Sequence, residues 1–107
     1  MITCQITYEG KVQGVGFRAT VLALARGFDV AGEVKNLPDG RVELLLQGEP
    51  QEVEEFLKAI KESHLGSHIM SEQKNLMDAD STLRFRGFKI LPSTLQLFNP
   101  STSRSNL

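Results

Sequence analysis

Apolar and polar residues alternate strictly at the start of the chain, and this alternation predicts a half-buried strand over residues 2–9. Apolar residues then recur at helical spacing from about residue 18 to 27, so we expect a helix with one face on the core. Residues 31–37 and 41–47 are again strand-like, and Pro38-Asp39-Gly40 between them is typical of a turn. These two strands should form an antiparallel β-hairpin.

A second helix is predicted from Pro50 to near Ser63. Proline suits a first helical turn, and the glutamates that follow it favour the positive end of the helix. The apolar residues fall at i, i+3, i+4 and i+7 along one stripe: Val53, Phe56, Leu57 and Ile60. The second helix should therefore also pack one face on the core.

The last third of the chain has a weaker pattern. A short strand near residues 68–73 fits, although its alternation is poor, and residues 83–91 form a better strand. In the better strand the apolar phase reverses around Gly87, and a glycine at such a position often marks a bulge. Residues 92–107 are rich in serine, threonine and asparagine, so we expect a domain over residues 1–91 and a loose C-terminal extension over residues 92–107.

The order of elements is strand, helix, strand, strand, helix, strand. Two such βαβ halves predict an α+β, ferredoxin-like split βαβ sandwich. In that fold a four-stranded antiparallel sheet carries both helices on one face, and right-handed crossovers limit the alternatives.

Composition narrows the class of protein. A chain of 107 residues can build one domain with one modest core. The formal net charge of -1 creates no global field that would attract nucleic acid or an anionic membrane, and no apolar run approaches the roughly 20 residues of a membrane span. No signal peptide precedes the first strand, and the single cysteine, Cys4, cannot form an internal disulfide. We therefore expect a cytoplasmic protein. We also expect a monomer.

The stretch from Gly10 to Arg18 is the best candidate for chemistry, because Gly14 and Gly16 lie between a strand and a helix. Glycine-rich turns can point successive N–H groups at an anion, and the following helix adds its positive end. Arg18 adds a guanidinium that matches phosphate oxygens. Two alternatives compete with this interpretation. The glycines can be simple turn residues. Gly14-x-Gly16-x-x-Ala19 also fits the loose dinucleotide-binding pattern, but this chain is too short for the several parallel βαβ units of a dinucleotide-binding fold.

Asn36 is the second candidate, since it ends the strand before the turn and could face the glycine loop. Its amide could orient a water molecule, or it could simply cap the turn. His64 and His68 have a spacing that can bind metal on a helix, but Gly66 lies between them and no third ligand is evident, so no metal site is predicted. A site with no evident general acid suits an acyl phosphate, whose carboxylate leaving group has a conjugate-acid pKa near ~4.

Two stretches resemble the signature sequences of the acylphosphatase family. They are Lys11-Val12-Gln13-Gly14-Val15-Gly16-Phe17-Arg18 and the run from Gly32 to Glu43, and their separation also matches. The resemblance is clear over residues 6–57 and resumes at residues 85–90. The chain departs from the family pattern at Glu33, in residues 64–76 and in the tail.

The resemblance implies hydrolysis of a small-molecule acyl phosphate to a carboxylate and inorganic phosphate, without metal or cofactor. It implies that Arg18 and Asn36 are the catalytic residues, with Arg18 binding the phosphate and Asn36 holding the attacking water. It also implies these phosphate-binding residues: Gln13, Gly14, Val15, Gly16, Phe17 and Arg18.

Two other classes of protein remain. An RNA-binding sheet would carry aromatic residues on its central strands, and residues 41–46 contain none. A non-catalytic or accessory module that binds acyl or carbamoyl phosphate would carry the same site residues, and only a turnover assay separates it from an enzyme.

Overall fold

The computed structural model describes residues 1–77 and 85–92. Its elements are β1 (Ile2–Gly10), α1 (Phe17–Ala25), β2 (Val30–Asn36), β3 (Val42–Gly48), α2 (Pro50–Glu62), the 3-10 helix η1 (His64–His68), β4 (Ile69–Leu76) and β5 (Phe88–Ile90). Both predicted helices, the first strand and the β-hairpin are confirmed, with ends that differ from the sequence prediction by one or two residues.

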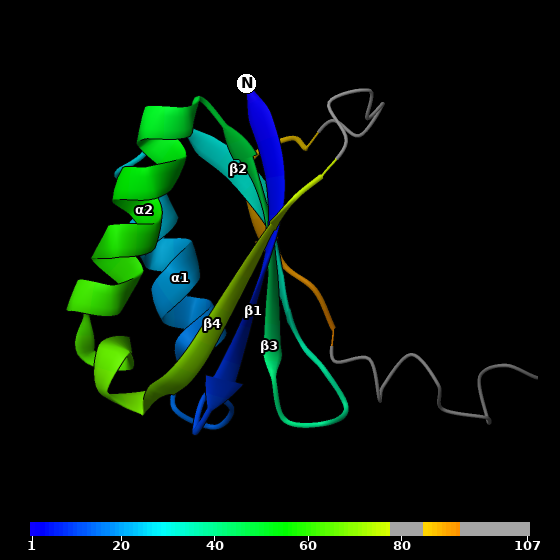
Figure 1. The fold of residues 1–107 in the computed structure, drawn as a ribbon, viewed down its shortest axis with the longest axis vertical. Helices are drawn as coiled ribbons and strands as arrows, with labels where there is room; N and C mark the ends of the chain where they lie inside the picture. The colour runs from blue at the N-terminus through cyan, green and yellow to red at the C-terminus, as the bar shows by residue number, and fades with distance from the viewer. Residues whose placement is uncertain (78–84, 93–107) are drawn as a thin grey trace, which may run out of the picture.

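The strands form one sheet in the order β4-β1-β3-β2-β5. Figure 1 shows both helices on the same face of this sheet. The order β4-β1-β3-β2 with two covering helices confirms the predicted ferredoxin-like sandwich. The prediction of four antiparallel strands is wrong in one respect, because a fifth strand, β5, pairs with β2 in parallel.

The fifth strand is short, and main-chain hydrogen bonds at both of its ends fix it to β2. The N–H of Gly32 donates to the carbonyl of Gly87 at 2.9 Å, and the N–H of Leu91 donates to the carbonyl of Val34 at 2.9 Å. Gly87 has a φ of 68°, which suits glycine, so the residue where the apolar phase reverses is a turn into the strand rather than a bulge within it.

The core lies between the sheet and the two helices. Alternate residues of β1 and β3 are fully buried on the helix face, as the alternating pattern predicts. The predicted apolar stripe of α2 is buried in full: Val53, Phe56, Leu57 and Ile60. The ring of Phe56 lies between those of Phe28 and Phe88, with centroids 5.6 Å and 5.8 Å away, so β5 is attached to the core as well as to the sheet.

Strand β4 explains the weak pattern in the last third of the chain. It lies at the edge of the sheet, and two of its charged residues point toward the helices. Glu72 forms an ion pair with Lys61 of α2 at 3.5 Å, and Lys74 pairs with Glu54 of the same helix. Inward-pointing charges are a common feature of edge strands, and they break the apolar alternation that reveals a central strand.

Two predictions fall partly or wholly outside the described residues. The start of the strand predicted over residues 83–91 lies there, and so does the C-terminal extension beyond Pro92. Within the described part of the chain, neither helix has the length and apolar character needed to cross a membrane.

Candidate active site

The loop between β1 and α1 depends on two glycines in the left-handed region. Gly14 has a φ of 82° and Gly16 a φ of 77°. Among the described residues, no atom lies within 4 Å of a Cβ placed on either glycine, so backbone conformation rather than crowding requires them. The side chain of Val12 is fully buried and anchors the loop on the core.

Gly16 is the N-cap of α1, and its carbonyl accepts the first helical hydrogen bond, from the N–H of Thr20 at 2.9 Å. The N–H groups of the first turn have no partners inside the helix, and together with the helix dipole they favour an anion. The first turn contains no acidic residue that would compete for them. The start of α1 is therefore built to receive negative charge.

A cavity of about 250 Å³ lies at this helix start. Figure 1 shows that the loop after β1 and the turn after β2 lie at the same end of the sheet. Residues from the loop, α1, β2 and β5 line the cavity: Val12, Gly14, Gly16, Phe17, Arg18, Ala19, Asn36 and Ile90. The structure thus brings Arg18 and Asn36, the two predicted catalytic residues, into one cavity with the loop glycines.

Two predicted phosphate-binding residues, Gln13 and Val15, are absent from the lining of this cavity. Val15 packs partly buried against the core, and the side chain of Gln13 is directed toward the β2–β3 turn. Sequence reasoning missed Ala19 and Ile90. The return of the family resemblance at residues 85–90 was the only signal for Ile90, because nothing else in the sequence placed this segment beside β2.

Arg18 lies in the first turn of α1 and is half-buried. Its Nη1 donates to the main-chain carbonyl of Leu91, just beyond β5, at 3.3 Å. A guanidinium has five N–H donors, so this contact orients the group and leaves most of its donors available for an anion in the cavity.

Asn36 is the last residue of β2 and lies opposite Val42 of β3. A tight turn follows it. The N–H of Leu37 donates to the carbonyl of Arg41 at 2.8 Å, and the N–H of Gly40 donates to the carbonyl of Leu37 at 3.2 Å. Asn36 therefore lies in the last strand pair before a closed hairpin turn, next to the hydrogen-bonded Leu37 and Arg41, where its backbone is well fixed.

An ion pair stiffens the same turn. One carboxylate oxygen of Asp39 lies 2.8 Å from Nε of Arg41, and the other accepts from the Arg41 N–H at 3.1 Å. Hydrogen bonds from the Arg41 side chain and backbone lower the pKa of Asp39 below its usual range. Both groups are exposed, so this pair shapes the turn rather than contributing charge to the cavity.

The cavity offers an anion site with one guanidinium and one amide. Of the described residues that line it, none is a carboxylic acid or a histidine. Across the described residues, no group of three histidine, cysteine or acidic side chains has the arrangement of a metal site. The arrangement can hold and polarise a phosphoryl group, and it suits a leaving group that departs without receiving a proton.

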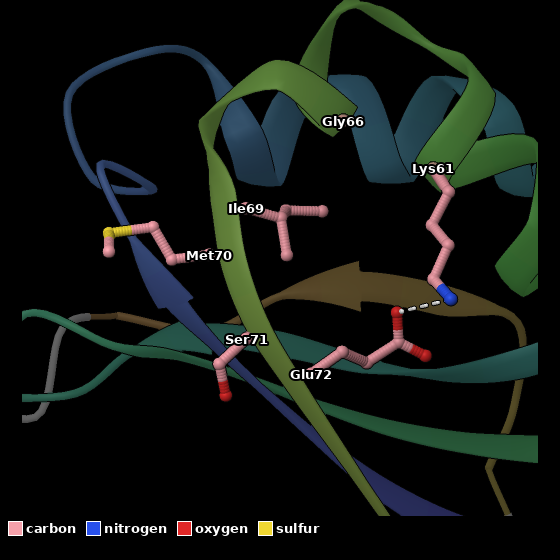
Figure 2. A pocket seen from close by; sticks show the side chains of 6 residues that line it. All are labelled: Lys61, Gly66, Ile69, Met70, Ser71 and Glu72. Atoms are coloured by element: carbon pink, nitrogen blue, oxygen red, sulfur yellow. Dashed lines mark ion pairs between the residues drawn. The ribbon is translucent and has the colours of Figure 1, made fainter.

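A second cavity, of about 440 Å³, lies between the end of α2, η1 and β4 (Figure 2). Lys61 and Glu72 face each other across it, and Met70 points away from this pair. Because Glu72 neutralises the lysine of this lining, the cavity lacks the unpaired positive charge found beside the glycine loop. Its larger volume does not make it the better candidate for an anion.

Comparison with known proteins gives a consistent result. The sequence model of the acylphosphatase family matches residues 4–90. An acylphosphatase from Acaryochloris marina is 36% identical over 91 residues, which cover 85% of this chain and 95% of that protein. The crystal structure of an acylphosphatase from Bacillus subtilis superimposes with a TM-score of 0.76 at 34% identity, covering 85% of this chain and 99% of that one. Full-length HypF in a phosphate- and nucleotide-bound form gives a TM-score of 0.75 at 31% identity, but this chain covers only 12% of it.

Proposed function

The chain belongs to the acylphosphatase family, and from that membership we propose that it hydrolyses small acyl phosphates to a carboxylate and inorganic phosphate. The main support from this chain's own structure is that Arg18, Asn36 and the loop glycines line a single cavity at the positive end of α1. Such a cavity can bind a dianionic phosphoryl group, which is the part shared by every acyl phosphate.

In the proposed reaction, the phosphoryl oxygens accept hydrogen bonds from the Arg18 guanidinium and from main-chain amides of residues 13–18. The planar fork of an arginine matches two of these oxygens at once. Preorganised donors of this kind also stabilise charge that develops on the phosphoryl group in the transition state. The contact between Arg18 and the Leu91 carbonyl supports this role, because it holds the guanidinium at the cavity before substrate arrives.

Asn36 is proposed to position the attacking water. Its amide can accept from the water and donate to a phosphoryl oxygen, which fixes the direction of attack. The water oxygen forms the new P–O bond while the bond to the acyl oxygen breaks, and the electron pair leaves on the carboxylate. The proton of the water passes to the phosphate product or to solvent. Because a carboxylate is a stable anion at neutral pH, the leaving group needs no general acid.

A turnover assay tests the activity. Benzoyl phosphate is a suitable substrate, because its hydrolysis changes the ultraviolet absorbance. We expect saturable turnover that survives a strong chelator and is inhibited by inorganic phosphate. Binding of phosphate without turnover would contradict the proposal and favour an accessory binding module. The HypF match makes that second candidate specific, since there the same fold forms a small part of a much larger protein.

The role of Asn36 is tested by Asn36→Ala. If Asn36 positions the water, kcat should fall on the order of a hundredfold while phosphate inhibition changes little, because Arg18 and the loop still hold the anion. If Asn36 only caps the turn, the variant should lose about 1 kcal/mol of stability and keep its kcat. Asn75→Ala, at an exposed position of β4, is the matched control.

We further propose that residues 1–91 form the catalytic domain, that the enzyme is a monomer and that it works in the cytoplasm. The single cysteine, Cys4, is free and buried, which supports a reducing compartment. The proposed reaction does not use this thiol. Burial also raises the pKa of the Cys4 thiol, which makes it a poor nucleophile. Sedimentation at several protein concentrations tests the monomer.

A further inference from the structure

We infer that the side chain of Gln13 is a positioning residue that fixes the distance between the phosphate loop and Asn36. The inference rests on the proposed function and goes beyond it, because it gives Gln13 a role through its side chain rather than through its backbone amide. Gln13 lies in the glycine loop, and its partners lie on the β2–β3 turn.

The geometry of the contact is a two-point clamp. Nε2 of Gln13 donates to the carbonyl of Leu37 at 2.8 Å and to the carbonyl of Arg41 at 2.9 Å. Both distances are in the range of good hydrogen bonds. These two carbonyls stand at the two ends of the turn, so one amide group bridges the loop to both strands of the hairpin.

The hydrogen-bonding capacity of glutamine argues against a direct contact between this side chain and phosphate. An amide nitrogen has two N–H donors, and both are used on the carbonyls. The remaining polar side-chain atom, Oε1, can only accept a hydrogen bond, and the dianionic phosphoryl group of an acyl phosphate has no hydrogen to donate to it. The absence of Gln13 from the cavity lining agrees with this assignment.

The clamp acts on Asn36 because Leu37 is the next residue in the chain. The turn that it holds is itself rigid, since Leu37 also donates to Arg41 and since Asp39 pairs with Arg41. Because the turn is rigid, the hydrogen bonds of Gln13 also constrain the position of Asn36 relative to the loop. Loss of the clamp should leave the loop anchored by Val12, but should leave the distance from the loop to Asn36 less well defined.

The test is a double-mutant cycle between Gln13→Ala and Asn36→Ala with benzoyl phosphate. In the wild-type background, we expect Gln13→Ala to lower kcat by roughly 10- to 100-fold, the scale of a displacement of about 1 Å in a reacting group. The inhibition constant of inorganic phosphate should change less than about threefold. In the Asn36→Ala background, the further loss should be small, because the group being positioned is already gone.

Gln5→Ala is the matched control. Gln5 is a second glutamine whose side-chain amide joins two segments of the chain, but it lies within β1 and donates to Glu43 of β3 instead of to the turn. We expect this variant to keep its kcat whatever it loses in stability. A Gln13→Ala variant that loses only stability would overturn the inference, and so would a rise in the phosphate inhibition constant that parallels the loss of kcat.

Failure of the positioning role of Gln13 can be distinguished from failure of the proposed function. If the wild-type protein turns over benzoyl phosphate and Gln13→Ala does so equally well, the positioning role is wrong and the activity stands. If the wild-type protein is inactive, the proposed function is wrong, and hydrogen exchange at the Leu37 N–H then tests the clamp directly. Faster exchange in Gln13→Ala would support the clamp, and unchanged exchange would overturn it.

Discussion

Removal of the Arg18 guanidinium is the most direct test of where phosphate binds. Arg18 supplies the one formal positive charge among the described residues that line the cavity, and it lies beside N–H groups of the first helical turn that have no partner within the helix. Arg18→Ala should therefore weaken both substrate binding and stabilisation of the transition state. The fold should survive, because the side chain is only half-buried and lies outside the core cluster.

The size of the effect follows from the contacts that the guanidinium can make. A hydrogen bond to a charged group contributes roughly 1.5–3 kcal/mol. Each 1.36 kcal/mol is a factor of ten in rate, so one lost contact lowers kcat/KM by about 10- to 150-fold and two lost contacts by up to about 10⁴-fold. The cost to folding should be smaller, since the hydrogen bond that Arg18 makes among the described residues, to the Leu91 carbonyl, is long at 3.3 Å and only part-buried.

Steady-state kinetics with benzoyl phosphate, phosphate inhibition and a urea melt should be measured on the same preparations. Arg18→Lys should also be poor, because a single ammonium group cannot contact two phosphoryl oxygens in the plane of a guanidinium fork. Arg26→Ala is the matched control, since Arg26 is exposed at the other end of the same helix and its loss changes the net charge equally. Turnover near the wild-type level in Arg18→Ala would refute the assignment of this cavity as the active site.

Two predictions concern stability. The hydroxyl of Tyr8 is buried without a hydrogen-bond partner among the described residues, while its ring contacts Phe17. Tyr8→Phe removes this hydroxyl and keeps the ring, so it should raise the free energy of unfolding by about 1 kcal/mol. A large loss of stability in a urea melt would show that the hydroxyl has a hydrogen-bond partner. Burial raises the pKa of Tyr8 far above its usual value, so the wild-type protein should lose stability above about pH 10, where the unfolded tyrosine ionises, and Tyr8→Phe should lack that component. Because Arg41 lowers the pKa of Asp39 in the folded state, the stabilising effect of Asp39 should be present above about pH 4 and lost as the pH falls through the folded-state pKa. Asp39→Asn should flatten this acid limb of the stability curve, and identical acid limbs in the wild-type protein and the variant would contradict the role of the pair.

The sequence was most informative where residues are buried on one face. Strands β1 and β3 lie in the middle of the sheet, so burial of alternate side chains leaves a clear period of two. Helix α2 buries an unbroken stripe, and its bounds were predicted almost to the residue. The turn at Pro38-Asp39-Gly40 was equally clear, because Gly40 has a φ of 96° and few residues other than glycine adopt it without strain.

The two edge strands were the hardest to predict. An edge strand has a neighbour on one side only, so burial constrains its side chains less than those of a central strand. In β4 the inward positions hold Glu72 and Lys74, whose ion pairs with α2 replace apolar burial. In β5 only three residues pair, which is too short for any periodicity to be visible. Neither pattern distinguishes a strand from a polar loop, and the predicted strand count was therefore too low.

The same limit explains what was missed in the site. Gly14, Gly16, Arg18 and Asn36 were predictable because their chemistry or conformation is visible in the local sequence. The lining by Ile90 and the acceptor role of the Leu91 carbonyl depend on a parallel pairing between β2 and β5, which brings together segments more than 50 residues apart. A main-chain carbonyl also has no sequence signature, since every residue carries one.

This dependence links the proposed chemistry to the stability of β5. The strand is held by three paired residues, by the flanking hydrogen bonds and by the ring of Phe88 against Phe56. If β5 detaches locally, Arg18 loses its Leu91 contact and the cavity loses Ile90, while the loop and Asn36 stay in place. An edge element with so few contacts opens more easily than the central strands. The orientation of the proposed phosphate-binding arginine is therefore set by one of the least strongly held elements of the fold, and loosening of β5 should reduce turnover before the protein unfolds.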